Sequence, residues 1–133
     1  MQHTPYHQDQ PYYNIEGTQN VSFWLPVDPV PVESSLCFVS GSHTGRWYLP
    51  TTFLTETAKW FPKGTLEPVP DIDGDPSAFK LLQWAVEPGD ALAFHMLCLH
   101  GSKGTTGRRR AFSVRVTGDD VVHAPRLWRT SPE

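Results

Sequence analysis

Charged residues are scarce in this 133-residue chain: they make up 19% of it, against an average of about 25%. The net charge is −3, so the chain as a whole lacks the basic surface that nucleic-acid binding requires. No apolar run approaches the ~18 residues of a membrane helix. The N-terminus also lacks the charged and then apolar segments of a signal peptide. We therefore expect a cytoplasmic protein that binds neither nucleic acid nor membrane.

Cysteine is also rare. Cys37 and Cys98 each lie inside an apolar run, and two cysteines are too few for a disulfide scaffold. We expect two buried free thiols. Aromatic residues, in contrast, reach 12% of the chain, which excludes disorder for most of it, because disordered segments hold few aromatics.

Proline and glycine are abundant, with 13 and 10 residues, and this disfavours long helices. Short apolar or alternating runs at 21–27, 35–39, 91–95 and 110–117 predict strands that end in turns. Residues 45–80 carry five prolines and read as a long irregular insertion. The pattern predicts a mainly β sandwich or barrel, with residues 1–133 forming a single domain.

The histidines provide the first candidates for chemistry. His7 and Asp9 are two positions apart, so in an extended segment both point to the same side and offer ligands that suit divalent iron. His95 and His100 are five positions apart, which places them on opposite faces of a strand, so at most one of them should join His7 and Asp9. His100 precedes Gly101, where backbone can approach a ligand closely. His95 fits better as a residue that packs or hydrogen-bonds in the wall.

A basic run follows His100. Residues 101–107 have the composition of a hairpin loop, so we expect the chain to bring Arg109 or Arg110 back beside His100. A guanidinium group fits a carboxylate through two parallel hydrogen bonds. A solvated basic loop explains Arg108 well, but the residues alone leave open which of the other two arginines faces the site.

The order of these motifs resembles the phytanoyl-CoA dioxygenase family of non-haem iron(II), 2-oxoglutarate-dependent oxygenases. The resemblance runs from residue 6 to about residue 117. It is carried by Tyr6-His7-Gln8-Asp9, Phe23-Trp24, Val39-Ser40-Gly41-Ser42-His43, Pro88-Gly89-Asp90, Phe94-His95, His100-Gly101-Ser102 and Arg109-Arg110-Ala111-Phe112-Ser113.

This resemblance implies a double-stranded β-helix, the jelly-roll or cupin-like type of barrel. It also implies three ligands for Fe(2+) and three residues around the co-substrate 2-oxoglutarate. The metal ligands would be His7, Asp9 and His100; the co-substrate residues would be Arg109, which binds the distal carboxylate, with Ser102 and Trp24 beside it. Arg110 is the neighbour that competes with Arg109 for this assignment.

The implied activity is a dioxygenase reaction with O2 that hydroxylates a C–H bond of a small-molecule substrate. Succinate and CO2 would be the co-products. Halogenating relatives lack the carboxylate ligand, so the presence of Asp9 favours hydroxylation. The insertion at residues 45–80 would roof the substrate site.

The chain departs from the family at its front, because only six residues precede His7. We therefore expect the C-terminal majority of a catalytic barrel, incomplete at its N-terminus. An open barrel edge would favour self-association and leave the isolated chain marginally stable or inactive.

Two alternatives remain open from the sequence. A non-catalytic cupin-like metal-binding module would use the same three ligands but would not need Arg109. A carbohydrate-binding β module would stack sugars on exposed aromatic rings. The candidate rings are Trp47, Tyr48, Trp60, Phe61 and Trp84.

Overall fold

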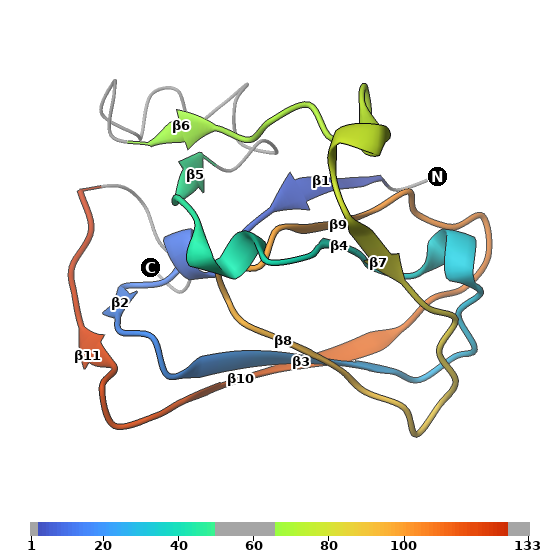
Figure 1. Cartoon of the computed structure of the whole chain (residues 1–133). Helices are drawn as coiled ribbons and strands as arrows, with labels where there is room; N and C mark the ends of the chain where they lie inside the picture. The colour runs from blue at the N-terminus through green and yellow to red at the C-terminus, as the bar shows by residue number, and fades with distance from the viewer. Residues whose placement is uncertain (1–2, 50–65, 128–133) are drawn as a thin grey trace.

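Two facing antiparallel sheets make up most of the computed structural model, which describes residues 3–49 and 66–127 (Figure 1). The four-stranded sheet has the order β1–β9–β4–β7, and the three-stranded sheet has the order β10–β3–β8. The strands of the first are β1 Thr4–His7, β9 His100–Ser102, β4 Cys37–Val39 and β7 Leu81–Gln83; those of the second are β10 Ala111–Thr117, β3 Asn20–Pro26 and β8 Leu92–Phe94. The chain therefore has the predicted double-stranded β-helix architecture.

Shorter elements complete the described part of the chain. Two pairs of short strands are β2 Ile15–Glu16 with β11 Val122–His123, and β5 Tyr48–Leu49 with β6 Glu67–Pro68. Four 3-10 turns are η1 Gln10–Tyr12, η2 Val32–Ser34, η3 Ser42–Thr44 and η6 Pro76–Ala78. Within the described residues, no helix is long and apolar enough to cross a membrane.

The predicted strands all form, within two residues of the expected bounds. β3 and β10 pair over seven positions, with Ser22 opposite Arg115 and Trp24 opposite Ser113. Successive residues of a strand point to opposite faces, so these four side chains share one face of the three-stranded sheet. Ser22 is buried, and this face is therefore the inner one, turned toward the other sheet.

The four-stranded sheet buries side chains on both of its faces. Phe38 pairs with His100 and with Leu82, which places these three on the inner face. Val39 alternates with Phe38 and belongs to a core cluster on the outer face with Ile72 and Leu99. Burying each such aliphatic side chain contributes roughly 1.5–3 kcal/mol.

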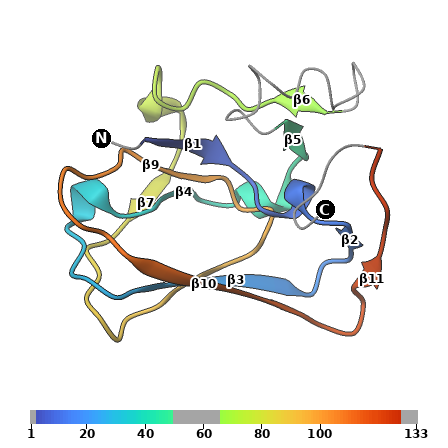
Figure 2. The same cartoon turned by 180° about the vertical axis from the view of Figure 1, so that it is seen from behind.

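The described part of the irregular insertion covers that outer face. Ile72, Val69 and Phe79 belong to or pack on the outer cluster, and β6 lies on the side of the four-stranded sheet away from β3 and β10 (Figure 1 and Figure 2). The expectation of a roof over the site is therefore wrong for residues 66–80. The remainder of the insertion, residues 50–65, lies outside the described residues. The apolar side chains of residues 66–80 pack instead on the outer face of the four-stranded sheet, where they are removed from water.

The predicted hairpin between residues 100 and 110 is also wrong. β9 pairs with β1 and β4, whereas β10 pairs with β3 in the opposite sheet. Residues 103–110 cross from one layer to the other, with Gly104 at a φ of +82°, a conformation that favours glycine. Turn residues mark a change of direction, but they do not specify which sheet receives the next strand.

Both cysteines are free, as expected, although each is only half-buried. The Sγ atom of Cys98 lies 3.6 Å from the hydroxyl of Ser42, which donates to it, and burial raises the pKa of this thiol.

The outer face of the three-stranded sheet is apolar and uncovered among the described residues. Phe112 and Val116 are 64% and 49% exposed. They share this face with Val114 and, across the pairing with β3, with Val21 and Phe23. Within the described part of the chain, β10 pairs only with β3, so its other edge is open.

Candidate metal centre

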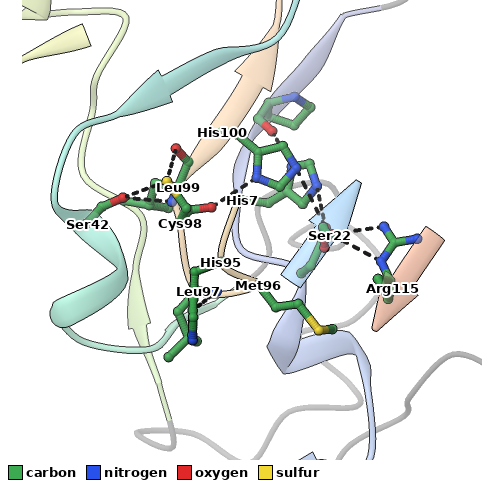
Figure 3. A network of polar contacts seen from close by, with 12 residues as sticks. His7, Ser22, Ser42, His95, Met96, Leu97, Cys98, Leu99, His100 and Arg115 are labelled. Carbon is green, nitrogen blue, oxygen red and sulfur yellow. Dashed lines mark hydrogen bonds and ion pairs between the residues drawn. The ribbon is translucent and has the colours of Figure 1, made fainter. Parts of the chain in front are cut away.

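His7 and His100 lie side by side because β1 pairs with β9 at this position. Their ring centroids are 4.3 Å apart (Figure 3). The Nδ1 atom of His7 is 2.9 Å from the carbonyl oxygen of Pro5, and that of His100 is 3.0 Å from the carbonyl oxygen of Cys98. A carbonyl only accepts, so each Nδ1 carries the proton and each Nε2 keeps a free lone pair. Both rings are thereby prepared as ligands through Nε2.

Asp9 reaches the same point by a turn of the chain rather than by strand alternation. β1 ends at His7, and Asp9 has φ −77° and ψ −43°, the start of η1. The backbone N–H groups of Asp9 and Gln10 both donate to the carbonyl of Met96, at 2.8 and 2.9 Å. Asp9 therefore faces His7 as predicted, but the extended geometry assumed for this segment is wrong.

The three predicted ligand residues converge. The Oδ1 atom of Asp9 is 3.6 Å from Nε2 of His7 and 3.6 Å from Nε2 of His100. One nitrogen or oxygen ligand atom from each residue lies within 4.8 Å of the others. Asp9 and His100 are buried, with 4% and 5% exposure. Two imidazole lone pairs and one carboxylate oxygen around one point are a donor set that suits divalent iron, so the residues fit such an ion.

Gln8, between the two ligands, holds this turn in place and was missed by the sequence reading. Its side chain is buried, and its Nε2 donates to the carbonyls of Arg46 and Leu97 at 2.8 and 2.9 Å. Its Oε1 accepts from the N–H of Tyr48 at 2.7 Å. The only available signal was its position between His7 and Asp9, which directs it to the opposite side.

The second carboxylate oxygen of Asp9 is engaged by the other sheet. Its Oδ2 accepts from the hydroxyl of Ser22 at 2.8 Å and from Nη2 and Nε of Arg115 at 2.9 and 3.2 Å. Ser22 and Arg115 are opposite each other on β3 and β10, and in Figure 3 Ser22 lies next to the two histidines with Arg115 beyond it. The sequence reading missed both; for Arg115 a signal was present in the inward positions of the alternating strand at 110–117.

The electrostatics leave Asp9 ionised and His100 neutral near neutral pH. Burial by itself would raise the pKa of the Asp9 carboxyl, but the polar and positive groups around it hold this pKa well below its ordinary value. These groups are His7, His100, Arg115 and Ser22. Burial lowers the pKa of His100 to about 4, with His7 adding to the effect and Asp9 opposing it. Deprotonated carboxylate and neutral imidazole are the forms that bind metals.

The three residues expected around the co-substrate also come together. Nη1 of Arg109 donates to the hydroxyl of Ser102 at 2.7 Å and to the carbonyl of Ser34 at 2.5 Å. The guanidinium carbon lies 5.8 Å from the centroid of the Trp24 ring. Ser102 belongs to β9, two residues beyond His100, so this group extends from the metal centre along the interior.

Arg110 points elsewhere. It is bound to Asp28 on the surface through Nη2 at 2.7 Å and Nε at 3.0 Å. His95 likewise stays out of the centre, as expected: its Nε2 is 2.8 Å from the carbonyl of Thr18, and its Nδ1 accepts from the N–H of Leu97 at 3.0 Å. Arg109 thus lies beside Ser102, whereas Arg110 lies on the surface beside Asp28. His100 belongs to the cluster with His7 and Asp9, whereas His95 does not.

An apolar cavity of about 350 Å³ adjoins the centre. Phe38 and Phe94 line it, and their ring centroids are 5.8 and 4.6 Å from that of His100. Leu82, Trp84 and Leu92 line it as well. These two phenylalanines therefore line the cavity and also lie against the His100 ring.

The aromatic residues considered for sugar binding have different surroundings. Arg126 lies over the Trp47 ring at 4.7 Å, Tyr48 packs on the outer core cluster, and Trp84 lies 6.4 Å from Phe38 between ring centroids. Trp60 and Phe61 lie outside the described residues. Trp47 and Tyr48 are thus engaged within the protein, whereas Trp84 is 50% exposed.

Comparison with known proteins gives one family match and several structural ones. Residues 2–111 match the sequence model of the family described as phytanoyl-CoA dioxygenase (PhyH). No curated protein matches the chain. Solved structures similar to it include SnoK, a non-haem α-ketoglutarate-dependent carbocyclase from nogalamycin biosynthesis, with 19% identity and a TM-score of 0.64 over 92% of this chain and 46% of SnoK.

Two further structures show the same fold. The non-haem monooxygenase ThoJ is 17% identical, with a TM-score of 0.66 over 93% of this chain and 43% of ThoJ. EvdO2 from Micromonospora carbonacea var. aurantiaca is 22% identical, with a TM-score of 0.57 over 96% of this chain and 51% of EvdO2. The chain spans about half the length of these proteins or less. Since the family match covers most of its residues, the chain belongs to the phytanoyl-CoA dioxygenase family.

Proposed function

We propose that the chain carries the catalytic barrel of an Fe(2+)- and 2-oxoglutarate-dependent dioxygenase that hydroxylates a C–H bond of a small molecule. The observation that carries this proposal is the convergence of two groups of residues inside one barrel: the His7–Asp9–His100 cluster and the Arg109–Ser102–Trp24 cluster. Among the similar structures, SnoN is described in complex with Fe3+, α-ketoglutarate and nogalamycin RO, and EvdO2 in complex with 2-oxoglutarate.

His7, Asp9 and His100 would hold the iron. Three protein ligands leave about three positions open on a six-coordinate ion, enough for two atoms of 2-oxoglutarate and for O2. When bound, iron with 2-oxoglutarate and O2 supplies an oxidant that removes hydrogen from a C–H bond, with succinate and CO2 as co-products. The protein's part is to orient the histidines and to keep Asp9 ionised. The carbonyl partners of both Nδ1 atoms support the first, and the hydrogen bonds that Ser22 and Arg115 donate to Asp9 support the second.

Arg109 would bind the distal carboxylate of 2-oxoglutarate. Its guanidinium group is half-buried between Ser102 and Trp24, and a fork of N–H donors matches a carboxylate. Arg110 is occupied by Asp28 on the surface. This difference in surroundings supports Arg109 over Arg110.

The substrate would enter from the apolar cavity beside His100. Its aromatic and aliphatic residues suit a small molecule with apolar surface, and His43 and His95 in its lining offer polar contacts. The similar structures include a carbocyclase, an epimerase and a monooxygenase, so proteins with this fold catalyse more than one type of reaction. Asp9 fills the position that a halide would need, and this supports hydroxylation.

Two further parts of the proposal concern the cell compartment of the protein and its association with a second copy. The unpaired cysteines fit the reducing cytoplasm, so we place the protein there. The open edge of β10 and the exposed apolar side chains Phe112 and Val116 support association with a second copy.

The second candidate function is a cupin-like metal-binding module without a co-substrate. It is favoured by the hydrogen bonds that already satisfy Nη1 of Arg109 inside the protein. In that case Arg109 would be structural, and only the metal cluster would be functional.

One experiment separates the two functions. Anaerobic addition of Fe(2+) and then 2-oxoglutarate should produce the weak visible charge-transfer band of a chelated keto acid. We expect Arg109→Gln to weaken 2-oxoglutarate binding about 10-fold or more, since it removes a charge-assisted hydrogen bond pair, and we expect the surface control Arg110→Gln to leave it unchanged. Iron binding without the band would favour the metal-binding module, and equal effects of the two substitutions would remove Arg109 from the proposal.

A further inference from the structure

The two carboxylate oxygens of Asp9 have different surroundings. Oδ1 lies 3.6 Å from Nε2 of each histidine ligand. Oδ2 accepts three hydrogen bonds, one from Ser22 and two from Arg115. The metal ligands come from β1, β9 and the turn after β1, whereas Ser22 and Arg115 come from the opposite sheet. Asp9 therefore joins the two layers, with one oxygen committed to each.

This division matters because a carboxylate can bind a metal through one oxygen or through both. With Asp9 bound through one oxygen, a six-coordinate ion keeps about three open positions; with both oxygens bound, it keeps about two. A chelating co-substrate and O2 together need all three. Whatever holds Oδ2 away from the metal therefore protects the third position.

We propose that Arg115 is a positioning residue that restricts Asp9 to metal binding through Oδ1 alone. This inference rests on the proposed function, because it assumes a metal at the cluster. Arg115 donates through both Nε and Nη2 to Oδ2, and a charged donor competes for that oxygen more strongly than a neutral one. Ser22 assists with its hydroxyl.

The placement of Arg115 is itself constrained. β10 pairs with β3 without a break from Ala111 to Thr117, and this register fixes the backbone of Arg115 opposite Ser22. The guanidinium carbon also lies 5.3 Å from the centroid of the Tyr13 ring, an arrangement that favours a cation over an aromatic face. The donor group is thus held in one orientation before any metal binds, as partners behind a metal ligand generally are.

The number of metal-bound waters tests this proposal directly. Mn(2+) is a redox-stable substitute for Fe(2+), and oxygen-17 water relaxation counts the waters on it. In the wild-type chain saturated with Mn(2+) we expect about three waters. In Arg115→Met we expect about two, because Oδ2 then keeps only the neutral Ser22 donor and can also bind the metal. Arg115→Lys, which keeps a charged donor, should restore the wild-type count. Arg110→Gln, an arginine substitution beside Asp28 rather than Asp9, is the matched control and should not change it.

The same samples also report on 2-oxoglutarate. We expect Arg115→Met to weaken its binding to the Mn(2+) protein about 10-fold, with no such loss in Arg110→Gln. An unchanged water count in Arg115→Met overturns the inference. If that variant does not fold, Arg115→Gln, whose shorter neutral side chain also frees Oδ2, gives the same comparison. Wild-type protein that binds Mn(2+) but no 2-oxoglutarate would contradict the proposed function, and the water count would still decide the role of Arg115. Wild-type protein that binds no Mn(2+) would contradict both the proposed function and this inference.

Discussion

Gln8 shows how one uncharged side chain can determine the geometry of a charged site. It makes three hydrogen bonds to backbone groups of Arg46, Leu97 and Tyr48, and it lies between the two candidate ligands His7 and Asp9. Tyr48 begins β5 and Leu97 lies in the turn between β8 and β9, so Gln8 connects the end of β1 to both segments. Removing it would leave buried backbone groups without partners.

We therefore predict that Gln8→Met destabilises the protein by about 2–4 kcal/mol, because buried backbone donors and acceptors lose their partners. Urea unfolding measures this cost. Gln83→Met is the matched control, since Gln83 is half-buried and its Nε2 makes a hydrogen bond of 3.1 Å to the carbonyl of Ser35; it should cost about 1 kcal/mol or less. Equal unfolding midpoints for the two variants would contradict the special role of Gln8.

At the scale of residues, the sequence predicted which side chains converge at the candidate centre better than it predicted the residues that support them. His7, Asp9 and His100 belong to short motifs whose chemistry is visible in the residue types. Gln8 and Arg115 act through contacts that span 89 and 106 positions of the chain. Such contacts depend on which strands become neighbours, and residue types alone do not carry that information.

At the scale of elements, the close pairing of β1 and β9 brings the two histidines together. Gly101 makes this pairing possible: a Cβ atom there would lie 3.0 Å from the carbonyl oxygen of Thr4 and 3.1 Å from the backbone nitrogen of Tyr6. The backbone that approaches Gly101 closely is therefore that of β1. The expectation that a ligand would do so at this position is wrong.

We predict that Gly101→Ala moves β1 away from β9 and lowers the affinity of the centre for Mn(2+) by about 10-fold or more, a loss comparable to that caused by disturbing the groups around metal ligands. Titration calorimetry measures the affinity. In Gly107→Ala the new Cβ would meet only the hydroxyl of Thr105, at 3.8 Å, so this control should bind Mn(2+) as the wild type does. Retained affinity in Gly101→Ala would show that the strand spacing does not limit the site.

The start of β10 is held in place by a different interaction, the ion pair between Asp28 and Arg110. The Asp28 carboxylate accepts from the backbone N–H of Arg110 at 2.9 Å as well as from its guanidinium group. These hydrogen bonds, those of the Arg110 side chain first, lower the pKa of Asp28 from 3.8 to about 2. As pH falls, the unfolded chain takes up this proton before the folded chain does, so folding loses stability.

The contribution of Asp28 is complete above pH 3.8 and is lost as pH falls toward 2, the window set by its two pKa values. We predict that Asp28→Asn makes unfolding midpoints in urea less dependent on pH across this window. Arg110→Gln should flatten the dependence only in part, because it removes the guanidinium group but keeps the backbone N–H that donates to Asp28. A pH profile unchanged by both substitutions would mean that this pair does not hold β10.

At the scale of the whole molecule, the two layers differ in how their outer faces are covered. The outer face of the four-stranded sheet is buried under residues 66–80, whereas the outer face of the three-stranded sheet is open among the described residues. The short apolar and alternating runs predicted all three strands of the three-stranded sheet, but only β4 of the four-stranded sheet. They could not predict which face the insertion covers, because the insertion's apolar residues would look the same above either one.

The uncovered sheet leads to a prediction about association. Phe112 and Val116 point outward from β10. One edge of that strand pairs with no other strand among residues 3–49 and 66–127, and such an edge offers backbone groups to a second chain. A contiguous apolar face beside such an edge favours pairing between copies. We therefore expect the wild-type chain to shift from monomer to larger species as its concentration rises, as measured by analytical ultracentrifugation.

A charge on this face should reverse the association, because pairing would then bury it without a partner. We predict that Phe112→Lys combined with Val116→Lys raises the concentration for half-association about 10-fold or more, and that both side chains can change without loss of the fold because they already face solvent. Val32→Lys is the control: Val32 is 45% exposed but lies on η2, away from this sheet. If Val32→Lys weakened association as much as the double substitution, general charge repulsion rather than the β10 face would be responsible. A wild-type chain that stayed monomeric at all concentrations would show that the edge of β10 does not bind a second copy.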